Sequence, residues 1–82
     1  MTPSTTSALQ LLIDAADARY GAFASTHEAM GVALEEWDEL RDAIRDNDLS
    51  AVAKESLDLA AACIRLHDQL AYVQMLRDRS VK

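Results

Sequence analysis

Two short acidic motifs contain the residues best suited to do chemistry. Glu35, Glu36 and Glu39 form an EExxE pattern, and Glu55 and Asp58 form an ExxD pattern further along the chain. Residues three apart on a helix lie on the same face, so each motif predicts a pair of neighbouring carboxylates. Carboxylate oxygens are the ligands that hard divalent cations prefer, so the motifs indicate a Mg²⁺ site, with Mn²⁺ as an alternative.

The two pairs are expected to face each other across a helical hairpin. They lie at similar distances before and after the polar turn 46–48, and helices joined by so short a turn pack antiparallel. Four facing carboxylates would repel one another and would be costly to desolvate, and a cation would relieve both problems. Each motif alone is also typical of a solvated acidic helix face. On these residues alone, both interpretations stay open.

The elements that must position the carboxylates are all predicted to be helices. The chain is rich in Ala and Leu and holds only 2 Gly and 1 Pro. A first helix is expected to start at a cap between Ser4 and Ser7, to carry an apolar stripe, and to end at Gly21. Ser25 and Glu28 form the capping box of a second helix, which should end near residues 45–47.

A third helix is predicted from residue 49 almost to the C-terminus. Asp48 or Ser50 would cap it, and it is either one long helix or two helices broken near His67. Between Leu57 and Leu66 it is apolar on nearly every side, which predicts burial on most sides. Cys63 lies in this run and is expected to be a buried thiol.

Composition and charge narrow the class of protein. The 82 residues suffice for one domain, 1–82, with residues 1–6 expected to be loose. A net charge of -6 argues against a nucleic-acid partner. No segment is apolar enough to span a membrane, no signal peptide is evident, and the single cysteine suits a reducing compartment. We therefore expect a cytoplasmic protein with neither a nucleic-acid nor a membrane partner.

The chain displays more apolar surface than three helices can cover. The long third helix is one source, and its last turns add further apolar residues. Trp37 in the second helix belongs to an apolar stripe and is expected in the core or in an interface. The predicted fold is an all-α, small antiparallel bundle of three to four helices, completed by oligomerisation into a homodimer or tetramer.

The acidic motifs resemble a known family. The run from Glu35 to Glu39, followed by Glu55 and Asp58, resembles the EExxE…ExxD signature of the MazG-like all-α nucleoside triphosphate pyrophosphohydrolases. The resemblance covers roughly residues 23–70 and includes the helical segments on both sides of the motifs. It implies an oligomeric all-α bundle that uses Mg²⁺ to hydrolyse a nucleoside triphosphate to the monophosphate and pyrophosphate.

The resemblance also implies a role for each acidic residue. Glu36, Glu39, Glu55 and Asp58 would be the metal ligands, and Glu35 would support them or help the attacking water. Arg65 lies seven residues after Asp58, near the same face, where its guanidinium would suit a substrate phosphate or an ion pair with a nearby carboxylate. The alternative function is a non-catalytic helical interaction or nucleotide-binding protein with an acidic face.

Overall fold

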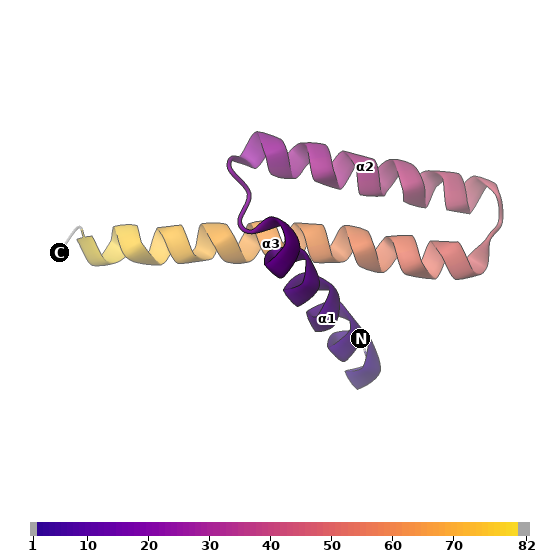
Figure 1. Ribbon diagram of the computed structural model, residues 1–82, viewed down its shortest axis with the longest axis horizontal. Coiled ribbons are helices and arrows are strands. Elements are labelled where there is room, and N and C mark those ends of the chain that lie inside the picture. Colours follow the sequence, from indigo (N-terminus) through magenta and orange to yellow (C-terminus); the bar gives the residue numbers. More distant parts are fainter. Residues whose placement is uncertain (1, 81–82) are drawn as a thin grey trace.

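The protein is built from three α-helices. The computed structural model describes residues 2–80, which form α1 (Pro3–Tyr20), α2 (Thr26–Arg45) and α3 (Leu49–Ser80) (Figure 1). These residues contain no strand. The all-α prediction is therefore confirmed. No helix in the described part of the chain is long and apolar enough to cross a membrane.

Helix α1 begins earlier than the sequence predicted. Thr2 is its N-cap, because the Thr5 N–H donates to the Thr2 hydroxyl oxygen over 3.1 Å. Pro3 occupies the first turn, where the missing N–H costs nothing and the fixed φ suits a helix. The predicted cap between Ser4 and Ser7 is wrong, and residues 3–6, expected to be loose, lie in the first turn of α1.

The predicted boundary between α1 and α2 is confirmed. Gly21 has a φ of 71°, a conformation that favours glycine, and its N–H closes the helix on the Asp17 carbonyl over 2.9 Å. Half of the predicted capping box is present, because Glu28 bonds to the residue before the N-cap Ser25 and not to Ser25 itself. The Ser25 hydroxyl accepts a hydrogen bond from the Glu28 N–H over 3.1 Å, and the Glu28 carboxylate accepts one from the Ala24 N–H over 3.3 Å.

Helices α2 and α3 form an antiparallel hairpin (Figure 1). Asn47 takes a positive φ of 53° in the turn, which Asn tolerates better than most residues, and Asp48 caps α3 by accepting from the Ala51 N–H over 3.1 Å. Ala29, Leu40 and Ala43 are the buried residues of α2. Two of these three side chains are small, so the helices can approach closely along this seam.

Helix α1 packs on α3 at a marked angle to the hairpin (Figure 1). Leu9 and Ile13 form a buried cluster with Ala61, and side chains of α3 on the same face pack around it. Close backbone contacts join α1 to α3 and α2 to α3, and none joins α1 to α2 within the described residues. A groove lies between α1 and α2, and residues of α3, Ala61 and Ala62 among them, line its floor.

Two side chains of α3 form hydrogen bonds with the end of α1 and with the loop between α1 and α2. The Arg65 guanidinium donates to the Asp17 carboxylate over 2.8 Å and to the Gly21 carbonyl over 2.7 Å, and it lies over the Phe23 ring. One turn later, the Gln69 amide accepts from the Phe23 N–H and donates to its carbonyl, each over 2.9 Å. These contacts fix the connection, and with it one end of the groove.

Helix α3 is continuous through His67, so the alternative of a break there is excluded. Its last turns extend past the start of α2 (Figure 1). Cys63 is exposed, so the predicted buried thiol is wrong. α1 and α2 cover only part of the circumference of α3. Cys63, Leu70 and Val73 form an exposed side of α3.

Candidate functional site

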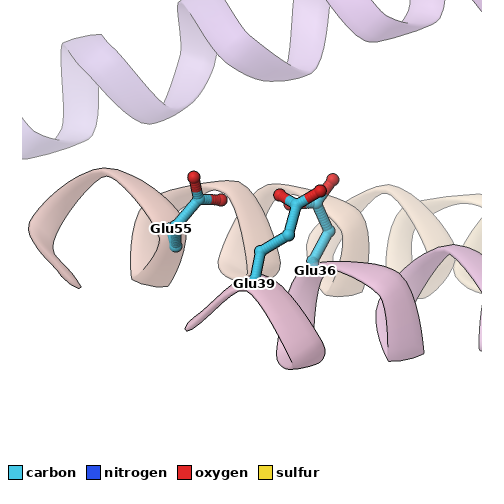
Figure 2. A group of neighbouring side chains, drawn as sticks. All are labelled: Glu36, Glu39 and Glu55. Carbon is cyan, nitrogen blue, oxygen red and sulfur yellow. The ribbon is translucent and has the colours of Figure 1, made fainter. Parts of the chain in front are cut away.

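Three glutamates from two helices meet at the groove. One carboxylate oxygen each of Glu36, Glu39 and Glu55 lies within 4.8 Å of the other two. Glu36 and Glu39 come from α2 and Glu55 from α3, and their carboxylates point to the same side (Figure 2). The hairpin register therefore brings the two motifs together as the sequence predicted. We call these three residues the glutamate cluster.

The glutamate cluster leaves hydrogen-bonding capacity unused. The Oε2 atoms of Glu36 and Glu55 are buried, and neither has a hydrogen-bond partner among the described residues. The Glu55 side chain is only 15% exposed. A buried polar atom without a partner costs free energy, so such atoms favour a bound ion or an ordered water.

Crowding of negative charge perturbs two of the three groups. Burial raises the pKa of Glu36, and the nearby charges of Glu39, Asp58 and Glu55 raise it further. The pKa of Glu39 is raised mainly by the neighbouring Glu55 carboxylate. Both shifts mean that the carboxylates resist ionisation at this spot without a cation.

Asp58 lies beside the glutamate cluster and is held by a lysine. The Lys54 ammonium donates to the Asp58 carboxylate over 3.0 Å and to Glu55 over 3.3 Å. These two carboxylates raise the pKa of Lys54, which keeps it charged. The Lys54 side chain is 69% exposed, and its ammonium reaches Asp58 one turn further along α3. Lys54 therefore supplies a cation within the acidic site.

The two remaining candidate residues occupy different surroundings. Glu35 is exposed on α2 and lines the groove. Arg65 also lines it, but its guanidinium is committed to Asp17, Gly21 and Phe23. Of the two roles left open for Arg65, the ion pair is present. A role in binding substrate stays a prediction.

The groove is a cleft large enough for a nucleotide. Its volume is ≈ 750 Å³, within the usual range for small-ligand sites. Glu36, Glu39 and Asp58 line it from the hairpin, and Arg19 and Tyr20 line it from α1. The α1 residues had no motif to mark them. Their only sequence signal was the position of Arg19 and Tyr20 in the last turn before Gly21.

The chemistry of the glutamate cluster suits a hard divalent cation. It offers three carboxylates, all oxygen donors, and two of them have free buried oxygens. Mg²⁺ accepts a small number of carboxylates and fills its remaining positions with water and phosphate oxygens. An open cleft beside the cluster would leave room for those other ligands.

Comparison with known proteins adds no identification. No protein-family model matches this chain, and neither the curated proteins nor the solved structures give a significant match.

Proposed function

We propose that the protein is a Mg²⁺-dependent hydrolase that converts a nucleoside triphosphate to the monophosphate and pyrophosphate, as its resemblance to the MazG-like family implies. The observation that carries the proposal is the glutamate cluster, with its buried, unpartnered oxygens, at the edge of a cleft of ≈ 750 Å³. A solvated acidic face would not bury carboxylate oxygens without partners. Burial of such oxygens favours a ligand-binding role.

Glu36, Glu39 and Glu55 would hold the cation, and Asp58 would join them where Lys54 releases it. The cation would neutralise charge on the triphosphate and acidify the water that attacks the α-phosphate. Glu35 lines the cleft with an exposed carboxylate, from which it can accept the proton of that water. Lys54 keeps part of the acidic charge balanced before substrate arrives. The proposed compartment is the cytoplasm.

Product analysis is the direct test. With Mg²⁺ and a panel of ribo- and deoxyribonucleoside triphosphates, we expect at least one nucleotide to yield its monophosphate and pyrophosphate in equal amounts. Chelation of the metal should stop the reaction. Release of orthophosphate and a diphosphate would contradict cleavage between the α- and β-phosphates, and no product from any nucleotide would refute the enzyme.

The second part of the proposal is that the active species is a homo-oligomer. α2 exposes a row of large apolar side chains on the side away from the glutamate cluster: Met30, Leu34, Trp37 and Ile44. Trp37, the largest of these side chains, is 45% exposed. A continuous apolar helix face of this kind is usually covered by a partner, and the apolar side of α3 described above adds to it.

Light scattering at micromolar concentration should therefore give a mass of at least twice the 9.0 kDa monomer. Trp37→Asp should shift the mass toward the monomer, because a charge in the middle of an apolar interface is costly to desolvate. The matched control is Asp38→Asn, an exposed change at the next position. A monomeric wild-type protein would contradict this part of the proposal and leave the hydrolase untouched.

The same apolar row is the observation that favours the alternative function, a non-catalytic interaction or nucleotide-binding protein. In that case the row would bind a different protein and the acidic side would keep the complex soluble. Titration with Mg²⁺ and Mn²⁺ separates the two functions. A defined stoichiometry and a gain in thermal stability favour the metal site, whereas an ordinary acidic surface gives neither.

A further inference from the structure

The two walls of the cleft differ in chemistry. The α2 wall is acidic and carries Glu36 and Glu39. The α1 wall is built from small and apolar side chains, Ala15 and Ala16 among them, and its last turn adds Arg19 and Tyr20. The first wall suits a cation. The α1 wall leaves space for the rest of a ligand and ends in the Arg19 guanidinium and the Tyr20 ring.

Of the three basic residues that line the cleft, two are committed to carboxylates. Lys54 pairs with Asp58 and Glu55, and Arg65 pairs with Asp17. Arg19 has no carboxylate within ion-pair distance among the residues described. Its guanidinium lies 5.2 Å from the centre of the Tyr20 ring. A cation–π contact of this kind leaves guanidinium N–H groups free to donate.

The charge of the cleft restricts which anion can enter. A free polyanion would be repelled by the glutamate cluster, whereas an anion that arrives with a divalent cation would be attracted to it. A metal-chelated triphosphate keeps some phosphate oxygens that the metal does not contact. Those oxygens need a donor, and Arg19 is the cleft cation that no carboxylate occupies.

We infer that α1 is the ligand-recognition wall of the cleft. Arg19 binds phosphate oxygens of the metal-chelated nucleotide, and the space beside Ala15 and Ala16 receives its sugar and base, with the Tyr20 ring at the end of that space. This inference rests on the proposed function, and it assigns a separate role to each wall of the cleft. The hairpin holds the metal, and α1 recognises the rest of the ligand.

A large side chain placed on α1 inside the cleft tests whether this helix contacts the ligand. Ala15 and Ala18 are both exposed on α1, but only Ala15 lines the cleft. Ala15→Trp should block binding of the α,β-methylene analogues of the common ribo- and deoxyribonucleoside triphosphates with Mg²⁺, measured by calorimetry. Ala18→Trp, which carries the same helix-propensity cost, should bind them as the wild type does. Titration with Mn²⁺ alone should be unchanged in both.

Removing the charge of Arg19 tests whether its guanidinium donates to the phosphate oxygens. Arg19→Gln should weaken binding of the same analogues about 10- to 100-fold, the range for loss of a charge-assisted hydrogen bond. Arg41→Gln is the matched control, because it removes the same charge from a residue that pairs with Asp38 outside the cleft. Mn²⁺ binding should persist in Arg19→Gln.

The outcomes separate the inference from the proposed function. If the wild type binds an analogue and both Ala15→Trp and Arg19→Gln bind it equally well, the inference is overturned and the hydrolase stands. If the wild type binds Mn²⁺ but none of the analogues, both are overturned and a metal site alone remains. Loss of analogue binding in Ala15→Trp and Arg19→Gln, but in neither control, supports the inference.

Discussion

Glu36→Gln is expected to lower kcat/KM for nucleotide hydrolysis by roughly 10²- to 10³-fold, equivalent to about 3 to 4 kcal/mol of transition-state stabilisation. Glu36 belongs to the glutamate cluster and holds one of its two buried, unpartnered oxygens. An amide keeps the shape of the side chain but offers a single neutral oxygen, which is a poor ligand for a hard cation. The loss should appear in steady-state pyrophosphate release at saturating Mg²⁺.

The matched control is Asp38→Asn on the same helix. Asp38 is exposed and pairs with Arg41, so this change removes the same charge from a site that contributes little. It should leave kcat/KM within about twofold of the wild type, as expected for a surface substitution. Equal activity in the wild type and Glu36→Gln would exclude Glu36 as a metal ligand. Equal losses in both variants would indicate a general effect of charge.

The sequence predicted the hairpin well because its signals are local. The Ser25 N-cap fixes the start of α2, and the turn at Asn47 fixes where the chain reverses. Once both are set, the register of an antiparallel pair follows from the helical rise, and it brings Glu39 opposite Glu55. A pair of motifs at matched distances from one turn could therefore be placed in space without tertiary information.

The contacts of Arg65 could not be predicted in the same way. Arg65 lies on the helix face expected for a residue that binds phosphate. Its side chain instead turns to the end of α1, where it donates to the Asp17 carboxylate and the Gly21 carbonyl. Nothing in the local sequence specifies how α1 lies on α3. Lys54 differs, because it lies four residues before Asp58, and residues four apart on a helix are neighbours, so this ion pair could be predicted from the sequence.

The burial predicted for residues 57–66 of α3 is confirmed at every position except Cys63, since the other residues of that run are buried or half-buried. An apolar run indicates that a helix is buried, but it does not say by what. In the described residues α1 covers the side of Ala61 and α2 lies along another side, and Cys63 stays exposed. The apolar excess that the sequence displays is thus visible as surface, which is the physical basis for expecting an oligomer.

The metal-free protein should lose stability through Glu36 as pH rises, and Mg²⁺ should reverse the loss. The folded-state pKa of Glu36 is raised above its ordinary value of 4.5, mainly by burial and then by Glu39 and the other nearby carboxylates. Between the unfolded and folded pKa values the folded state binds more protons, so the free energy of unfolding falls as pH rises through this window. Its contribution is fully present below about pH 4.5 and is lost above the folded pKa.

Other acidic groups also titrate, so the effect is isolated by comparing variants in EDTA. Melting temperatures of the wild type and Glu36→Gln should converge near pH 4.5 and separate as pH rises, with the variant more stable at neutral pH. Asp38→Asn should follow the wild type across the range. A wild type that matches or exceeds Glu36→Gln at every pH without metal would show that the cluster carries no repulsion to relieve.

Adding Mg²⁺ at neutral pH should reverse that order. At ten times its Kd, a cation that binds only the folded state contributes about 1.4 kcal/mol, which raises the melting temperature of a domain this size by about 5 to 10 °C. Glu36→Gln lacks one ligand and should gain little, whereas Asp38→Asn should gain as much as the wild type. An equal rise in all three proteins would place the cation elsewhere on the acidic surface. A rise that requires Glu36 identifies the glutamate cluster as the binding site, because the same carboxylate that destabilises the metal-free fold is the one that the cation needs.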